Sequence, residues 1–510
     1  MHTVSKSEGA AGKKKLWSII AASSAGTLIE WYDFYIFGSL ATILSSQFFP
    51  HTNPAAAFLS TLATFAAGFI VRPFGALVFG RLGDIIGRKY TFLLTLTLMG
   101  GSTFAIGLIP AFDEIGYAAP VLVLLLRLIQ GLALGGEYGG AATYVAEHAP
   151  AGRRGFYTSF IQTTATLGLF LSLGVILLSR YVVGIEAFNN WGWRIPFLLS
   201  SLLILVSVLI RMKMQESPLF AKIKSEGKVV KNPLKESFGK KDNLKMVLLA
   251  LFGATAGQGV VWYTGQFYAL SFIQKTMNIE FVQSNYIIAL GLLIATPFFV
   301  IFGAWSDRIG RRNIMLAGML LGIIFYRPIY KQMYALSDLS LKTDLPSYKS
   351  INTETKIGSG QENTFVVKTR EKAFTDGTTL RETITTTRTP GGEVAGEATN
   401  SEVVLSTQSF WYLTFLVAVQ VLFVTMVYGP IAAFLVELFP TNIRYTSMSL
   451  PYHIGNGVFG GLTPFIATSL TALPGASPFD GLWYPIGVAA VCFIIGLVYI
   501  NKSTDQTLNN

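Results

Sequence analysis

Residues 80–89 read GRLGDIIGRK, and residues 303–312 read GAWSDRIGRR. Both stretches follow the pattern G-x-x-x-D-x-x-G-R-[KR], and each lies between two long apolar segments. A charged turn that returns once in a mostly apolar chain is typical of a membrane protein with two similar halves. The two copies therefore predict a pair of repeated membrane bundles.

The composition of the chain is that of a protein that crosses a membrane many times. Of its 510 residues, 51% are hydrophobic and 13% are charged. In soluble proteins about a quarter of the residues are charged. Twelve apolar segments reach the length of about 20 residues that a helix needs to cross a bilayer. We therefore predict an all-α membrane protein with twelve transmembrane helices in two six-helix bundles. We also expect a monomer in the cell (inner) membrane.

Positive charge is concentrated in the loops on one side of these segments. The formal net charge is +11, and Arg153, Arg154 and the linker after the sixth segment contribute to it on the side of the N-terminus. The opposite loops at 111–119 and 471–482 contain no Lys or Arg. Cytoplasmic loops carry such an excess, so we expect cytoplasmic termini and no nucleic-acid partner. One cysteine and four scattered histidines predict no metal site, and we expect no cofactor.

A second repeated landmark shows that the two halves differ in length. Glu147 precedes a pair of arginines in the first half, as Glu437 precedes Arg444 in the second. The extra length of the second half is a polar, Thr-rich stretch that we interpret as an insertion on the outer face. The predicted domains are an N-terminal bundle at 1–211, a cytoplasmic linker at 212–243, helices seven to nine at 244–334, the insertion at 335–408 and helices ten to twelve at 409–510.

The insertion contains a signal for a small β-hairpin. Residues Thr364 to Ala373 and Thr378 to Arg388 alternate polar and apolar side chains around Asp376-Gly377, a dipeptide typical of tight hairpin turns. We predict a hairpin between flexible arms. A disordered loop is the alternative, because the stretch is rich in Gly, Thr and charged residues.

Several short motifs, in order along the chain, resemble a known family. They are EWYDF at 30–34, RPFG at 72–75, Arg127 to Gly131, GGEYGG at 135–140, GWRIPF at 192–197 and ESP at 216–218. Together they resemble the major facilitator superfamily, and more narrowly its metabolite:proton symporter family of proline/betaine, oxoglutarate, citrate and shikimate carriers. The resemblance covers both halves except the insertion, and it implies transport by alternating access. No nucleophile–base pair, phosphate loop or metal motif in the sequence indicates an enzyme.

Five ionisable residues lie inside the apolar segments of the first half: Glu30, Asp33, Arg72, Arg127 and Glu137. Such a side chain costs several kcal/mol at mid-bilayer unless it is paired, so each is a functional candidate. Asp33 and Arg127 both lie about seven residues, or ~10 Å, from the outer surface. Arg72 and Glu137 share a level nearer the inner surface. We therefore expect the pairs Asp33–Arg127 and Arg72–Glu137, with Glu30 one turn deeper than Asp33 on the same helical face.

Three buried carboxylates against two guanidinium groups predict a proton site. A buried carboxylate without a partner can take up and release a proton near neutral pH, and Glu30 or Asp33 is the candidate. In the resembling symporters an aspartate of the first span and an arginine of the fourth form the coupling pair, and Asp33 and Arg127 occupy those positions. The alternative is that these residues form structural ion pairs that hold the helices together.

Polar side chains near the middle of the second half predict a substrate site. His453 lies near the midplane, where transporters bind substrate, and Asn456 follows one turn later. The seventh segment carries a dense polar and aromatic group: Gln258, Trp262, Tyr263 and Gln266. An apolar site with a few hydrogen-bonding groups suits a small solute. The alternative role of each residue is packing between helices or against lipid.

We interpret the repeated turn as part of a cytoplasmic gate. Asp84 and Asp307 are placed to face helix N-termini, whose dipoles favour negative charge. Ion pairs that close the cytoplasmic ends would break once in each transport cycle. The residues expected to form them are Arg88 with Glu147 and Arg311 with Glu437, and Arg444 belongs to the same gate. The alternative is that the positive charge only fixes the orientation of the chain.

The predicted function is proton-coupled symport of a small polar metabolite, an organic acid or a zwitterionic osmolyte. Its partners are then the substrate, protons and the lipid bilayer. The arginines could attract a carboxylate, whereas Trp262 and Tyr263 would equally suit a quaternary ammonium group. A sugar-type facilitator or symporter and an antiporter are alternatives within transport. A membrane receptor or osmosensor that binds its ligand on the outer insertion is an alternative of another class.

Overall fold

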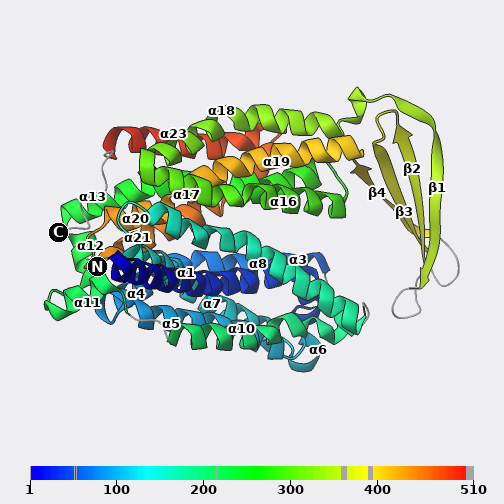
Figure 1. Cartoon of the computed structure of the whole chain (residues 1–510). Coiled ribbons are helices and arrows are strands. Elements are labelled where there is room, and N and C mark those ends of the chain that lie inside the picture. Colours follow the sequence, from blue (N-terminus) through cyan, green and yellow to red (C-terminus); the bar gives the residue numbers. More distant parts are fainter. Residues whose placement is uncertain are drawn as a thin grey trace.

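The computed structural model describes residues 2–50, 52, 54–184, 187–212, 216–357, 364–388 and 394–500. Two bundles of long helices stand side by side, and a β-sheet projects from one end of the second bundle (Figure 1). The N-terminal end of α1 and the C-terminal end of α23 lie at the opposite end, which we call the terminal end. The end that carries the sheet is called the sheet end.

The first bundle contains six spans. The spans and the short helices between them are α1 (His2–Ser39), α2 (Ala41–Phe48), α3 (Pro54–Ile70), α4 (Arg72–Ile85), α5 (Arg88–Leu108), α6 (Phe112–Ile115), α7 (Ala118–His148), α8 (Arg154–Val183), η1 (Phe188–Gly192) and α10 (Arg194–Met212). Helices α3 and α4 together form the second span. Two short helices, α11 (Pro218–Ser225) and α12 (Pro233–Gly239), connect the bundles at the terminal end.

The second bundle also contains six spans, several of which consist of consecutive helical pieces. The seventh span comprises α13 (Lys241–Ala250), η2 (Leu251–Thr255), α14 (Ala256–Tyr263), η3 (Thr264–Tyr268), α15 (Ala269–Ser271) and η4 (Phe272–Thr276). The others are α16 (Phe281–Ala295) with α17 (Pro297–Ile309), α18 (Arg311–Ser337), α19 (Thr407–Tyr428) with α20 (Ile431–Leu438), α21 (Arg444–His453) with η6 (Ile454–Gly460) and α22 (Thr463–Thr471), and α23 (Trp483–Tyr499). Short 3₁₀ turns lie at η5 (Leu339–Leu341) and η7 (Asp480–Leu482).

Twelve spans agree with the sequence prediction. Within the described residues, nine helical segments are long and apolar enough to cross a membrane, and Arg194–Leu209 is a shorter apolar helix. Helix α1 and the run from Arg444 to Thr471 complete the set. The predicted two-bundle, twelve-helix membrane fold is confirmed.

Prolines lie at the breaks within several of the spans. Pro73, Pro297 and Pro430 lie where α3 passes into α4, α16 into α17 and α19 into α20. Proline has no N–H to donate within a helix, so it favours a new helix start at these points. One consequence for the site is that Arg72 begins a helix in the interior of the first bundle.

Glycines bring the second and fourth spans into backbone contact. A Cβ atom on Gly75 would clash with the backbone of Leu132, and one on Gly135 would clash with the carbonyl oxygen of Arg72. Small residues spaced in this way allow two membrane helices to pack closely. This contact fixes the rotation of α4 against α7 and therefore the direction of the charged side chains on both helices.

The insertion forms a four-stranded antiparallel sheet in the order β1-β2-β3-β4. Its strands are β1 (Asp344–Ile357), β2 (Thr364–Phe374), β3 (Thr379–Arg388) and β4 (Val394–Val404). The predicted hairpin is confirmed: β2 pairs with β3 around Gly377, which has φ 83°. The expectation of flexible arms and the alternative of a disordered loop are wrong for the described residues, because β1 and β4 pair with the outer edges of the hairpin. Thr and Val, which favour strands, extend the sheet.

The sheet is anchored on the second bundle. The N–H of Val403 donates to the carbonyl of Asn278 at 2.7 Å, and the N–H of Glu280 donates to the carbonyl of Val403 at 2.9 Å. The amide of Gln283 exchanges two further hydrogen bonds with the backbone of Leu405, at 2.8 and 2.9 Å. Strand β4 is therefore joined to the loop between the seventh and eighth spans.

Candidate functional site

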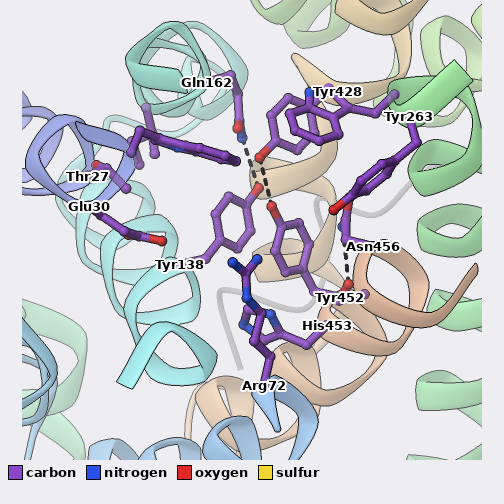
Figure 2. A pocket seen from close by; sticks show the side chains of 14 residues that line it. Thr27, Glu30, Arg72, Tyr138, Gln162, Tyr263, Tyr428, Tyr452, His453 and Asn456 are labelled. Carbon is purple, nitrogen blue, oxygen red and sulfur yellow. Dashed lines mark hydrogen bonds between the residues drawn. The ribbon is translucent and has the colours of Figure 1, made fainter. Parts of the chain in front are cut away.

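A cavity of about 40 Å³ lies between the two bundles (Figure 2). It has room for a few water molecules, because one water needs roughly 10–15 Å³ by this measure. The first bundle contributes seven lining residues: Thr27, Glu30, Trp31, Arg72, Tyr138, Ile161 and Gln162. The second bundle contributes Trp262, Tyr263, Tyr428, Tyr452, His453, Asn456 and Gly457.

Arg72 points into this cavity (Figure 2). Its guanidinium carbon lies 4.2 Å from the centre of the Phe69 ring, and its charge interacts with that of Glu30. Glu137, the partner predicted from helix depth, accepts a hydrogen bond from the hydroxyl of Thr95 at 2.9 Å. The structure therefore brings Arg72 together with Glu30 inside the cavity.

Asp33 and Arg127 lie close enough for their charges to interact. No ion pair within 4 Å joins them in the described part of the chain. Asp33 accepts a hydrogen bond from Ser200 at 2.6 Å through Oδ1, and its buried Oδ2 has no hydrogen-bond partner there. Arg127 donates to Gln130 at 2.7 Å, and its guanidinium lies 4.3 Å from the ring of Phe37. The predicted pair is thus an electrostatic contact without a direct hydrogen bond.

A pair of stacked tyrosines joins the bundles on the terminal side of the cavity. Tyr138 of α7 and Tyr452 of α21 have ring centres 3.7 Å apart and planes at 3°. Gln162 donates to the hydroxyl of Tyr138 at 2.8 Å, and the hydroxyls of Tyr428 and Tyr452 are hydrogen-bonded at 2.7 Å (Figure 2). His453 is next in the chain, and its buried Nε2 lacks a hydrogen-bond partner among the described residues.

A second aromatic pair joins the bundles nearer the sheet end. The rings of Trp31 on α1 and Trp262 on α14 have centres 5.8 Å apart. Asn456, one turn beyond Tyr452, exchanges two hydrogen bonds with Gln258 at 3.0 and 3.1 Å. Trp262 lies one turn further along α14, so the two aromatic pairs are separated by about 10 Å along the spans. The cavity lies between them.

Most of the predicted substrate-binding residues meet at this cavity. The cavity is lined by His453, Asn456, Trp262 and Tyr263. Gln258 does not line it but is hydrogen-bonded to Asn456, and Gln266 is not a lining residue. Sequence reasoning missed Thr27, Trp31, Gln162, Tyr138, Tyr428 and Tyr452. Tyr138 stands inside the GGEYGG motif, where glycines permit another helix to approach closely, and this signal could have identified it.

At the terminal end, each repeated aspartate binds the start of a helix from the other bundle. Asp84 accepts the N–H groups of Tyr445 and Thr446 at 3.3 and 2.8 Å, at the start of α21. Asp307 accepts the N–H groups of Gly155 and Phe156, both at 2.8 Å, at the start of α8. The predicted contacts with helix N-termini are present and related by the internal repeat.

Buried ion pairs lie beside both aspartates. In the first copy Arg88 contacts Asp84 at 3.2 Å and Glu147 at 3.8 Å, and in the second Arg311 contacts Asp307 at 2.5 Å and Glu437 at 2.9 Å. Two further pairs cross between the bundles: Arg444 with Glu147 at 2.7 Å and Arg154 with Glu437 at 4.0 Å. Arg154 was missed as a partner. The seven predicted gate residues therefore lie in two clusters related by the repeat, and each cluster contains one ion pair that crosses between the bundles.

Two repeated helical bundles, a polar cavity between them and mirrored ion pairs at one end define a membrane transport protein. Residues 18–244 match the model of the family described as Sugar (and other) transporter. The chain is 33% identical over 500 residues to a putative metabolite transport protein of Haemophilus influenzae, with 98% of this chain and 96% of that protein covered. It is 30% identical over 498 residues to the alpha-ketoglutarate permease of Escherichia coli, with 97% and 96% covered.

The chain belongs to the major facilitator superfamily, as its sequence motifs predicted. Among solved structures, it is similar to the proton:xylose symporter XylE from E. coli bound to 6-bromo-6-deoxy-D-glucose. The TM-score is 0.69, 98% of each chain is covered, and the sequence identity is 16%. At this identity the likeness concerns the fold. These relatives are named as transport proteins, and the chain is a multi-pass membrane transport protein like them.

Proposed function

We propose that this protein carries a small polar metabolite, an organic acid or a zwitterionic osmolyte, across the inner membrane together with a proton. The terminal end would face the cytoplasm, as the loop charges predict. The observation that supports the proposal best is the cavity, because its lining comes from both bundles and it lies between two aromatic pairs. A solute bound there would contact both halves of the carrier.

The cavity offers groups suited to a small polar solute. Arg72 and the hydroxyls of the tyrosines can donate hydrogen bonds, and His453 presents a ring nitrogen without a partner among the described residues. A guanidinium binds carboxylates well, while the faces of Trp31 and Trp262 can hold a cationic or apolar part of the same molecule. An acidic group and an alkylated or protonated amine would each find a partner here, once the cavity widens beyond the few water molecules for which it has room in this arrangement.

The proton would be coupled to the substrate through the buried carboxylates. Glu30 interacts with Arg72 in the cavity, so protonation of Glu30 would leave the guanidinium available to a substrate carboxylate. Asp33 is buried beside Arg127 and is the second candidate for the proton. Both groups are inside the membrane, where a bare charge is costly, so proton binding would change which helix arrangement is favoured.

Alternating access would follow from the position of the contacts between the bundles. At the terminal end the two aspartates, the ion pairs and the stack of Tyr138 on Tyr452 close the route from the cavity. In this structure the pair Trp31–Trp262 also joins the bundles on the other side of the cavity, so both routes are closed. The terminal contacts would separate when the carrier opens to the cytoplasm, and the Trp31–Trp262 contact would separate when it opens to the other side. A carrier of this kind needs two closures that do not open at the same time.

Uptake into proteoliposomes tests the function. With labelled organic acids, betaines and sugars, we expect accumulation of a metabolite that requires an acidic exterior and is lost with a protonophore. Asp33→Asn and Glu30→Gln separate the two proton candidates: the variant that removes the proton site keeps substrate exchange but no longer accumulates. Asp113→Asn, at an exposed residue, is the matched control. Uptake that ignores the pH gradient would favour a facilitator, and binding without flux would favour a receptor.

A further inference from the structure

A groove on the outer surface of the second bundle lies at the terminal end, between α13 and α23 (Figure 1). Its lining residues are Lys241, Leu244, Lys245, Leu248, Leu249, Phe252, Ile495 and Tyr499. Six are apolar or aromatic, and the two charged ones are both basic. Leu248 is 46% exposed and Tyr499 is 62% exposed, so the groove is open to the surroundings of the helices.

Along the direction of the membrane normal, the lining of the groove changes from basic side chains to apolar side chains. Lys241 and Lys245 are one turn apart at the start of the seventh span, and Leu248 and Phe252 continue the same helical face toward the bilayer interior. Both lysines are exposed, and neither forms an ion pair in the described structure, whereas their neighbour Lys240 is paired with Glu236. Two ammonium groups without an ion-pair partner in the described structure therefore lie at the terminal end of the apolar part of the groove.

A third cation, Arg312, lies near the terminal end of the groove without lining it. Arg312, which begins α18 with Arg311, donates to the carbonyl of Ile500, the residue after Tyr499. Its buried Nε has no hydrogen-bond partner among the described residues. The positive field at the terminal end of the groove therefore comes from two separate spans, which favours a bound anion there.

We propose that this groove binds an anionic phospholipid. The phosphate headgroup would lie on Lys241 and Lys245, and one acyl chain would lie along Leu248, Phe252 and Ile495. The charge complementarity and the order of polar and apolar groups match a phospholipid at the membrane surface. A zwitterionic lipid would cover the same apolar surface, but its positive headgroup would gain less from the lysines.

Such a lipid would act on the span that carries part of the substrate cavity. Helix α13 continues through η2 into α14, where Trp262 and Tyr263 line the cavity. A lipid held against α13 and α23 would restrain the terminal part of this span against the neighbouring span. The inference concerns a binding site, and it stands whether or not the proposed substrate and proton coupling are correct.

Native mass spectrometry of the purified full chain with phosphatidylglycerol or phosphatidylcholine tests the site. We expect the wild-type protein to retain phosphatidylglycerol in preference to phosphatidylcholine. In the double variant Lys241→Gln/Lys245→Gln, the ratio of the two affinities should be about 30-fold smaller, or roughly fivefold per lysine. The variant Lys222→Gln/Lys224→Gln, which removes the same charge from exposed positions on α11, is expected to keep the preference. Lys241→Arg/Lys245→Arg should also keep it, which separates loss of charge from loss of fold.

Other outcomes would overturn the proposal. Equal retention of the two lipids by the wild-type protein would mean that the lysines only extend toward water from the membrane edge. Equal preference in the wild-type protein and the Gln double variant would place the lipid elsewhere. A photoreactive side chain at position 248 should crosslink to lipid in membranes, and a crosslink to a second protein chain or to residues 501–510 would assign the groove to a protein segment.

Discussion

The two cross-bundle ion pairs at the terminal end occupy equivalent places in the repeat but differ in strength. Arg444 lies 2.7 Å from Glu147 with both side chains fully buried, whereas Arg154 lies 4.0 Å from Glu437 with its side chain 11% exposed. We therefore predict that Arg444→Gln opens the terminal end far more than Arg154→Gln does. The two substitutions remove the same charge at matched positions.

The expected magnitude follows from burial. Removing one partner of a buried ion pair costs about 3–5 kcal/mol. The lower value applies to Arg444→Gln, because Glu147 keeps a second partner in Arg88 at 3.8 Å. About 3 kcal/mol corresponds to a change on the order of 100-fold in the ratio of closed to open molecules. Arg154 lies 4.0 Å from Glu437, and Glu437 keeps two hydrogen bonds from Arg311, so Arg154→Gln is expected to cost at most ~1 kcal/mol, or roughly fivefold.

The assay is double electron–electron resonance, which measures the distance between two spin labels. Labels at Arg81→Cys on α4 and Arg308→Cys on α17 report the separation of the two bundles at the terminal end, where both residues are exposed. The single native cysteine, Cys492, is buried and does not compete for the label. We expect a short distance in the parent and in Arg154→Gln, and mainly a longer distance in Arg444→Gln. Equal shifts in the two variants, or no shift in Arg444→Gln, would refute the reasoning.

Three further predictions follow from other contacts. Gly135→Ala should lower the melting temperature and the yield of folded protein, because its methyl group would meet the carbonyl of Arg72; Gly174→Ala, where nothing lies near the added atom, is the control. Tyr138→Phe should retain most uptake, because the ring stack remains, whereas Tyr138→Ala should raise solvent access to the cavity from the terminal end, measured by cysteine labelling. Although partial burial favours the neutral form, hydrogen bonds from Lys342 and Thr378 hold the pKa of Asp376 below its usual value. The stabilisation of the β2–β3 turn by ionised Asp376 is present above the usual pKa and is lost as the pH falls below about 4. Amide hydrogen exchange in the turn should therefore accelerate below that pH in the wild-type protein. No acceleration relative to Asp376→Asn would contradict the contact.

Sequence patterns predicted the spans, the repeat and the turn at Gly377 because each depends on local composition or on short-range backbone geometry. The kind of contact that Asp84 and Asp307 make was also predictable, because a helix N-terminus attracts negative charge. Which helices they bind was not, because those helices belong to the other bundle. The position of Arg72 beside Glu30 could not be predicted from the sequence. Counting residues gives the depth of a side chain in the membrane but not the side of the helix it occupies, and that rotation is set by packing such as the contact of Gly75 with the neighbouring helix.

The aromatic pairs could not be predicted for a related reason. Trp31 and Trp262 are more than 200 positions apart, and nothing in either segment specifies the other. Their meeting depends on how two completed bundles dock. The outer strands β1 and β4 were missed because pairing partners, rather than local alternation, decide whether a Thr-rich segment becomes a strand.

The attachment of the β-sheet has a consequence for observing this carrier at work. Because β4 is hydrogen-bonded to Asn278 and Glu280, and Leu405 directly after it to Gln283, the sheet is a rigid extension of the second bundle. Strands of about ten residues reach ~33 Å, so a tilt of about 10° at the root would sweep the far end through roughly 6 Å. A dye or an antibody fragment bound at the far end of the sheet would therefore move by a measurable distance when the second bundle tilts by a small angle, and this movement could be observed from outside the membrane.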